Sequence, residues 1–387
     1  MTNDERSMLL DSARRYLDRS CSFEQRQASL NAAPGASAPD SLWPAFAEMG
    51  WLALGLPEAV GGLGSHGDQA ALAQELGRAL VPEPWLANTA LCAPVLNAWA
   101  PDLAAELASG QTRFALAAWE IQGRHDAFDV QTQAGLQDGH WVLTGRKTLV
   151  LGADTAHTLL VLARTRGRQR DTEGLSLFRI AADAPGVHIA ALPTYDGQRT
   201  ASVRLNAVTA DPGALLGPLH GAWPQVEAAL DTATVMQCAM SVGTMDKAFE
   251  LTQAYAVTRT QFGRPLSAHQ VIRHRLVDLF VSVAQARALT EAAAAALTHD
   301  APRRMRAASL AKAFVAQAGR KLGEEAVQMH GAIGMTDETE VGHAYKALAA
   351  QANLLGDAAW HLARLEQLDP LDSTHQPETP ACDATTP

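Results

Sequence analysis

The stretch between Pro224 and Pro265 constrains the fold of this chain more than any other. It contains no proline, and Gly243 is its one internal glycine before the Phe-Gly pair that precedes Pro265. Proline removes a backbone donor and breaks helices, so this spacing predicts one long helix. Such a helix would reach ~50 Å at 1.5 Å per residue.

Three further helical segments follow in the sequence. One starts at Ser267–Gln270, which fits a capping box, and runs through an alanine-rich segment to Pro302. The next is predicted from about Arg303 to Met329, and a fourth over residues 341–368. Long helices with short connections predict a four-helix bundle.

The rest of the chain divides into zones of different pattern. Residues 1–112 read as a helical domain, with periodicity that breaks at Pro82 and Pro84. Residues 113–218 consist of short apolar runs between Gly, Asp and Pro, and the Asp138-Gly139 pair is a hairpin signal. We therefore predict an α+β protein.

The predicted domains follow from these zones. They are an N-terminal helical domain (1–112), a small antiparallel β domain (113–218) and the C-terminal bundle (219–366). The last segment, 367–387, is rich in Pro, Thr and Asp, and we expect it to be disordered.

Composition excludes several classes of function. A net charge of −10 argues against binding to nucleic acid or to a membrane surface. The four cysteines are scattered without metal-ligand spacing, so we expect no metal site and a reduced, cytoplasmic protein. No apolar run approaches the ~20 residues that a membrane span requires.

The segment "TRTQFGRPLSAHQ", Thr258 to Gln270, places two arginines beside a Phe-Gly turn. An arginine fork donates paired hydrogen bonds to a phosphate, so the corner suits an anion. The alternative interpretation is a helix corner with a solvated arginine.

Four motifs in order resemble the acyl-CoA dehydrogenase family over nearly the whole chain, to about residue 366. They are "MGWLALGLPEAVGGLG" with "LAQELGRAL", "HWVLTGRKTLVLGADTAHTLLVLART", "YAVTRTQFGRPLSAHQ" and "QMHGAIGMTDE". Members of this family bind FAD and oxidise an acyl-CoA thioester. A carboxylate takes the proton next to the carbonyl, and the flavin takes a hydride from the next carbon.

The resemblance implies a set of FAD-binding residues. Arg259 and Phe262 match an arginine and a phenylalanine that reach across a dimer interface to the FAD of the neighbouring subunit, and Gln270 matches the glutamine that follows. Gln328 and Gly331 match a second segment at the same ADP moiety, where a glycine turn lets backbone N–H groups approach phosphates.

The flavin-ring half departs from the family pattern. Trp119 replaces a threonine that hydrogen-bonds the ring, and His125 replaces a serine near the substrate. Leu149 and Leu151 replace a stacking tryptophan and a second hydroxyl. An indole or a leucine cannot reproduce a hydroxyl donor, so we expect a degraded ring site with leucines that pack the core of the β domain.

The usual catalytic glutamate is also missing. Leu355, followed by Gly356, occupies its place, and the alternative place on the long helix falls near Ala233. Asp357 and Asp231 lie two residues away from these places and are the candidate bases. On a continuous helix two residues turn by ~200°, so Asp357 would face away from the cleft unless Gly356 breaks the helix.

Two main hypotheses follow. The chain is a partner subunit of an α2β2 acyl-CoA dehydrogenase that acts on steroid side chains or pimeloyl-CoA-like thioesters, or it is an autonomous enzyme. The autonomous enzyme is a homo-oligomer with Asp357 as its base, or a relative that uses flavin without dehydrogenation. A binding or assembly protein without flavin is a third possibility. We expect the partner to be a paralogous subunit or a second copy, and the electron acceptor to be an electron-transferring flavoprotein.

Overall fold

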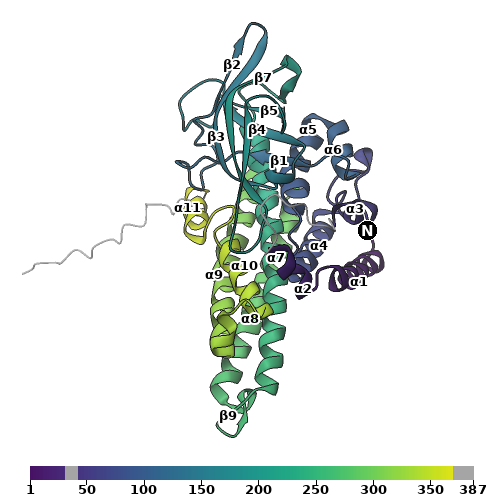
Figure 1. Cartoon of the computed structure of the whole chain (residues 1–387), viewed down its shortest axis with the longest axis vertical. Coiled ribbons are helices and arrows are strands. Elements are labelled where there is room, and N and C mark those ends of the chain that lie inside the picture. Colours follow the sequence, from purple (N-terminus) through teal and green to yellow (C-terminus); the bar gives the residue numbers. More distant parts are fainter. Residues whose placement is uncertain (31–41, 369–387) are drawn as a thin grey trace, which may run out of the picture.

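The computed structural model describes residues 1–30 and 42–368 of the chain. A β-sheet domain lies at one end of an elongated helical bundle, and a smaller group of N-terminal helices lies beside their junction (Figure 1). The tail predicted to be disordered from residue 369 onward lies outside the described residues.

The N-terminal domain is helical, as predicted. Its α-helices are α1 (Asn3–Ser20), α2 (Phe23–Leu30), α3 (Trp43–Glu48), α4 (His66–Arg78), α5 (Ala93–Trp99) and α6 (Pro101–Ala108). A 3₁₀ turn η1 (Glu58–Val60) and a π-helix η2 (Leu86–Cys92) complete it. The predicted break at Pro82 and Pro84 separates α4 from η2.

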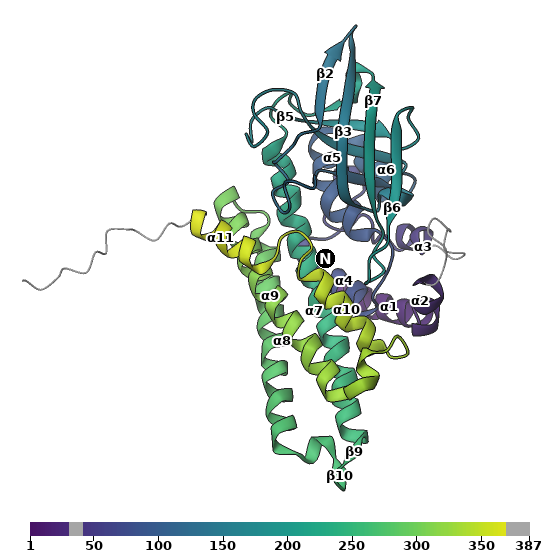
Figure 2. The same cartoon turned by 60° about the vertical axis from the view of Figure 1, so that its left-hand side comes forward.

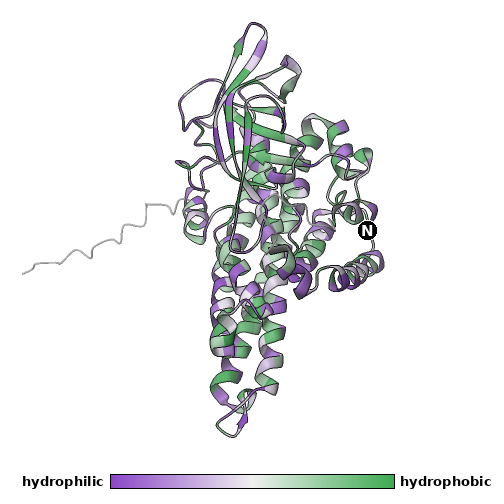
Figure 3. Ribbon diagram, in the orientation of Figure 1, coloured by the Kyte–Doolittle hydropathy of each residue, from purple (hydrophilic) through white to green (hydrophobic). Residues whose placement is uncertain are grey.

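The central domain is an eight-stranded sheet with the order β6-β7-β3-β2-β4-β5-β8, in which β1 pairs with β4. The strands are β1 (Phe114–Ala117), β2 (Gln133–Gln137), β3 (His140–Leu151), β4 (Thr158–Arg164), β5 (Leu175–Ala181), β6 (Val187–Leu192), β7 (Thr200–Ala210) and β8 (Leu215–Leu216). Short 3₁₀ turns η3 (Ala153–Thr155) and η4 (Pro212–Ala214) connect strands. The central strands are predominantly apolar, whereas α1 is mostly hydrophilic (Figure 3).

The predicted hairpin is confirmed. Asp138 and Gly139 join β2 to β3 with φ angles of 47° and 82°, which the two-residue turn of a twisted hairpin requires. The sheet is mainly antiparallel, as predicted, with the exception that β4 pairs in parallel with β1 and β2. The β1–β4 connection runs through the intervening hairpin, and a longer connection permits parallel pairing.

The C-terminal domain is built on the predicted long helix, α7 (Trp223–Thr258). The other helices are α8 (Gln270–Ala296), α9 (Ala301–His330), α10 (Glu340–Gln351) and α11 (Ala358–Leu368). Between α7 and α8 stand a two-stranded hairpin, β9 (Thr260–Gln261) and β10 (Arg264–Pro265), and the 3₁₀ turn η5 (Leu266–Ala268); η6 (Gly331–Met335) follows α9. Figure 2 shows α8, α9 and α10 beside α7, with the β9–β10 hairpin at the far end.

Two local predictions for the bundle are wrong. No capping box starts α8, because Ser267 lies in the 3₁₀ turn and His269 occupies the cap position without a side-chain bond. The predicted fourth helix is two helices, α10 and α11, separated at Leu355 and Gly356, whose φ angles are 61° and 102°. A left-handed backbone cannot continue a right-handed helix.

Helices α4 and α7 cross at a pair of glycines. A Cβ atom on Gly243 would lie 1.8 Å from the carbonyl oxygen of Gln74, and one on Gly77 would lie 1.9 Å from that of Met240. These are backbone atoms, so they cannot move aside as a flexible side chain can. The Thr244 hydroxyl donates to the Gly77 carbonyl oxygen at 2.9 Å and joins the two helices further.

In residues 1–30 and 42–368, no helix has the length and apolar character needed to cross a bilayer.

We predict that Gly243→Ala lowers the free energy of unfolding by about 3 kcal/mol, because the new methyl group overlaps the α4 backbone. Helix propensity alone favours alanine over glycine by ~1 kcal/mol, so a stability loss identifies the crossing as its cause. Denaturant unfolding measures it. Gly135→Ala on β2, where a Cβ atom meets nothing within 4 Å, is the control and should change stability by less than ~1 kcal/mol. Equal effects of the two changes would contradict the interpretation.

Candidate functional site

The predicted anion-binding corner lies at the end of the bundle furthest from the sheet (Figure 1). Arg259 ends α7, and Phe262 occupies the turn between β9 and β10 with φ of 54° and 92% of its surface exposed. Gln270, also exposed, is the first residue of α8. The guanidinium of Arg259 makes no hydrogen bond or ion pair within the described chain, so it is available to a phosphate.

The second predicted segment lies against the same end of α7. The rings of Tyr255 on α7 and His330 on α9 stack with centroids 4.3 Å apart. Gln328 lies one turn before the end of α9 and is exposed, and Gly331 follows with φ of 70° and open space around its Cα. The structure therefore places the two predicted segments on neighbouring helix ends.

Apolar side chains surround this corner. Several large ones on α7, α8 and the following loops are at least 45% exposed: Val257, Val271, Val277, Phe280, Val281, Ile333 and Met335. An exposed apolar surface of this extent is typical of a protein interface.

A first pocket, here called the leucine pocket, has a volume of about 590 Å³ and lies between the β domain and the end of α10. Its apolar lining is Trp119, Ile121, Leu149, Leu151, Pro193, Tyr195, Ala350, Leu354 and Leu355. The replaced ring-contact positions Trp119, Leu149 and Leu151 thus share one cavity. Thr148 is also among the residues that line it.

The expectation that both leucines pack the core is half right. Leu151 is 6% exposed and belongs to the core between the domains. Leu149 is 52% exposed because it sits in a β-bulge, with φ of 50° and a register shift between Lys147 and Val150. The bulge turns its side chain out of the sheet and into the pocket.

A buried ion pair fixes the Trp119 segment. The Lys147 ammonium donates to Glu120 Oε1 at 2.8 Å and to the Ala118 carbonyl, and Thr148 N–H donates to the Trp119 carbonyl at 2.9 Å. Burial raises the pKa of the Glu120 carboxyl, but the Lys147 charge and the hydrogen-bond donors outweigh burial and lower that pKa to about 2. The indole of Trp119 therefore stands on a rigid support.

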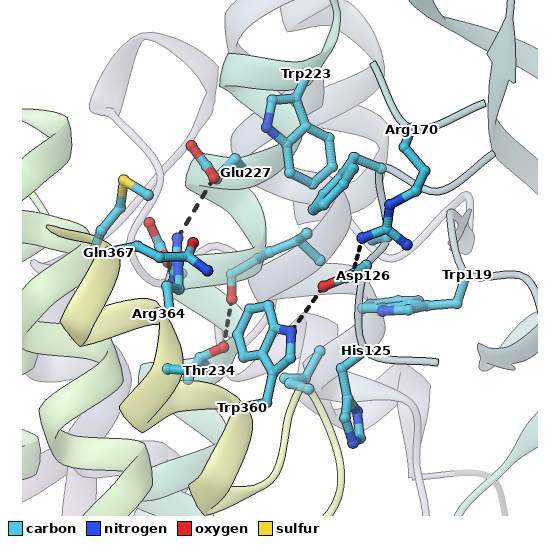
Figure 4. Close-up of a pocket in the computed structure, with 17 residues that line it drawn as sticks. Trp119, His125, Asp126, Arg170, Trp223, Glu227, Thr234, Trp360, Arg364 and Gln367 are labelled. Carbon is cyan, nitrogen blue, oxygen red and sulfur yellow. Dashed lines mark hydrogen bonds and ion pairs between the residues drawn. The ribbon is translucent and has the colours of Figure 1, made fainter. Parts of the chain in front are cut away.

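A second pocket, the aromatic pocket, has a volume of about 330 Å³ between the β domain, α7 and α11. Trp119, Phe128, Trp223 and Trp360 form its walls (Figure 4). The Asp126 carboxylate spans its mouth, because Trp360 Nε1 donates to one oxygen at 2.8 Å and Arg170 donates to the other at 2.8 Å. This bridge ties α11 to the β domain.

The floor of the aromatic pocket is an ion-pair network. Asp231, 1% exposed, accepts from Arg304 Nε at 3.0 Å and from Arg364 Nη1 at 2.6 Å. Arg364 also lies 3.7 Å from Glu227, whose carboxyl has a pKa raised by burial. Both carboxylate oxygens of Asp231 are held by guanidinium groups. Ala233, fully buried on the same helix, offers no polar atom.

The break between α10 and α11 defines the position of Asp357. Its Oδ1 accepts from Trp360 N–H at 2.8 Å and caps α11, and its Oδ2 lies 3.7 Å from His125 Nε2. Leu355, and not Asp357, lines both pockets together with Trp119 and His125. Gly356 does break the helix, yet the carboxylate caps α11 instead of entering the described pockets.

His361 holds this corner in place. It is fully buried, and burial lowers the pKa of its imidazole to about 3, so the ring is neutral. Its Nε2–H donates to the Leu355 carbonyl at 3.0 Å, and its Nδ1 accepts from the Ser309 hydroxyl at 3.2 Å. A Cβ atom on Gly356 would lie 2.7 Å from this imidazole, so the corner requires glycine.

Sequence reasoning missed several residues of the pockets. Trp360 and Arg364 were predicted only as part of the fourth helix over residues 341–368. A signal for two of them was present, since Trp360 and Arg364 are four residues apart and share a helix face. Their pairing with Asp126 and Asp231 joins distant parts of the chain and carries no local signal.

Comparisons with known proteins agree with this architecture. Residues 3–104, 115–208 and 221–366 match the N-terminal, middle and C-terminal domains of acyl-CoA dehydrogenases. The chain is 30% identical to acyl-CoA dehydrogenase IpdE2 of Mycobacterium tuberculosis, over 84% of this chain and 86% of that protein.

Two solved structures have the same fold. The ChsE4–ChsE5 complex from Mycobacterium tuberculosis superposes with a TM-score of 0.84 at 25% identity, covering 95% of this chain and 97% of that chain. A Tcur3481–Tcur3483 steroid ACAD variant gives a TM-score of 0.83 at 27% identity, covering 94% and 97%.

The helical, sheet and bundle domains, with pockets at their junction, define a flavin-dependent oxidoreductase of acyl thioesters. The chain belongs to the acyl-CoA dehydrogenase family, whose members use FAD. The residues of the chain are better suited to the diphosphate of FAD than to its flavin ring. The exposed Arg259, unpaired within the described residues, is chemically suited to a diphosphate, whereas Trp119, Leu149 and Leu151 give the leucine pocket no hydroxyl donor for a flavin ring.

Proposed function

We propose that this chain is the partner subunit of an α2β2 acyl-CoA dehydrogenase and lends the ADP-binding half of the FAD site to a paralogous subunit. One observation carries the proposal: Arg259 and Phe262 project from the end of the bundle furthest from the chain's own β domain. Gln270, Gln328 and Gly331 complete the lent half.

The residues that line the chain's own pockets also support the proposal that the paralogous subunit supplies the catalytic groups. A dehydrogenase needs a carboxylate at the reacting carbon, whereas Leu355, which matches the position of the family's glutamate and lines both pockets, has none. Asp231 is held by two arginines and Asp357 by the first turn of α11. In the complex the base therefore comes from the paralogous subunit.

Two of the similar solved structures support a substrate class and an assembly for this chain. A ChsE4–ChsE5 complex and a steroid ACAD are among the similar structures, which supports a heteromer and a steroid-derived acyl-CoA substrate. A pimeloyl-CoA-like dicarboxylic thioester is the other substrate class that we propose. We further propose an electron-transferring flavoprotein as the acceptor. The free cysteines Cys21, Cys92 and Cys238 support a reducing, cytoplasmic location.

The second candidate is an autonomous homo-oligomer with Asp357 as its base. The 3.7 Å approach of His125 to Asp357, beside both pockets, is the observation that favours it. A histidine–carboxylate pair could accept a proton if the corner between α10 and α11 moved. A flavin relative that does not dehydrogenate is the second form of this alternative.

The first prediction concerns flavin content. Purified alone, the chain should hold well under one FAD per chain, because Trp119 and Leu151 remove ring hydrogen bonds. The complex with the paralogous subunit should hold two FAD per four chains. Absorbance spectra measure both ratios. Full flavin content in the isolated chain, bleached by an acyl-CoA, would refute the partner-subunit proposal.

The next prediction concerns Arg259. Arg259→Ala removes charge-assisted hydrogen bonds to a diphosphate, each worth ~1.5–3 kcal/mol, so the purified complex should lose FAD while its fold survives. Arg166→Ala, an exposed arginine on the β domain, is the matched control and should leave the flavin content unchanged. Equal flavin content in both variants would show that Arg259 is only a solvated corner residue.

The last prediction of this section concerns Asp357. Asp357→Asn keeps the cap on α11, since asparagine also accepts from backbone N–H groups. We therefore expect the turnover of the reconstituted complex to stay within a few-fold of the parent. If Asp357 is the base, turnover should drop by ~10²–10⁴-fold at unchanged FAD content and oligomeric state, and that result would favour the autonomous enzyme.

A further inference from the structure

The mouth of the leucine pocket carries an unpaired cation. Arg124 lines this pocket, is exposed and adopts a left-handed φ of 50°. Its guanidinium makes no hydrogen bond or ion pair with the described residues. A non-glycine residue in this conformation is uncommon and often marks a functional position.

The acids of the pocket do not neutralise Arg124. Glu120 is sealed in its pair with Lys147, and Asp196 is 6% exposed and accepts from Gln198 N–H at 3.3 Å. The neighbouring His125 imidazole faces Asp357 across 3.7 Å. The mouth therefore presents one positive charge that lacks a partner.

The interior of the leucine pocket is large and mainly apolar. Its volume of about 590 Å³ lies within the ~300–1,000 Å³ range of small-molecule sites. Leu149 and Ile121 remain 52% and 83% exposed at its edge, so apolar surface is there to be covered by a ligand.

We propose that the leucine pocket binds a hydrophobic carboxylic acid, with its hydrocarbon skeleton in the pocket and its carboxylate at Arg124. The proposal rests on the proposed function in one respect, namely that the flavin ring does not occupy this pocket. Arginine suits the head group because its planar fork donates two parallel hydrogen bonds to a carboxylate.

The experiment uses the flavin-free full chain and two ligands of equal length, dodecanoate and dodecan-1-ol. Calorimetric titration at pH 7.5 should show one dodecanoate per chain. Arg124→Gln should weaken dodecanoate binding by about five-fold, as expected for an exposed ion pair, and leave dodecan-1-ol unchanged. The difference between the ligands isolates the charge from the apolar contact.

Two further variants locate the site. Arg166→Gln, an exposed arginine elsewhere on the β domain, should leave both affinities unchanged. Ala350→Phe places a ring in the pocket lining and should abolish binding of both ligands. Thermal unfolding checks the fold, and if Ala350→Phe fails to fold, the comparison of Arg124→Gln with Arg166→Gln still decides.

Two results would overturn the inference: no dodecanoate binding by the flavin-free chain, or dodecanoate binding that Arg124→Gln weakens no more than Arg166→Gln does. Failure of the proposed function has a different signature. Absorbance would then show one FAD per isolated chain, and reconstituted FAD would displace dodecanoate. If the isolated chain binds neither FAD nor dodecanoate, the carboxylic-acid site is refuted and the proposed partner-subunit function is not.

Discussion

The close crossing of α4 and α7 is the contact on which the rest of the structure depends. Gly77 and Gly243 bring two helix backbones together, and no side chain larger than hydrogen fits at either position. This crossing ties the N-terminal domain to the long helix that carries the aromatic pocket at one end and Arg259 at the other. The aromatic pocket and Arg259 are therefore positioned along one long helix.

The sequence predicted the long elements well because their signals are local. Prolines at 224 and 265 bracket α7, and Asp138-Gly139 specifies the β2–β3 turn. The start of α8 and the division of the last helix were missed. At Leu355 the chain adopts a left-handed conformation that leucine disfavours, and the buried His361 imidazole compensates through the Leu355 carbonyl. Such compensation is tertiary, so no sequence window shows it.

Only those candidate site residues that belong to a family motif could be predicted from the sequence. The residues at the end of the bundle came from the family resemblance, and the structure places Arg259 and Gly331 on neighbouring helix ends. Pairs such as Trp360 with Asp126 join segments more than two hundred residues apart. Periodicity cannot specify them, because a side chain's partner depends on how the β domain docks on α11.

The exposed end of the bundle has a consequence for the supply of this protein in the cell. Phe262 is 92% exposed, and Phe280 and Val277 on α8 are 60% and 59% exposed. A copy whose apolar surface is uncovered associates with other copies through it, which promotes precipitation and recognition by chaperones and proteases. If the proposed paralogous subunit covers this surface, synthesis of both subunits in equal amounts, from one transcript, would keep the number of unassembled copies small.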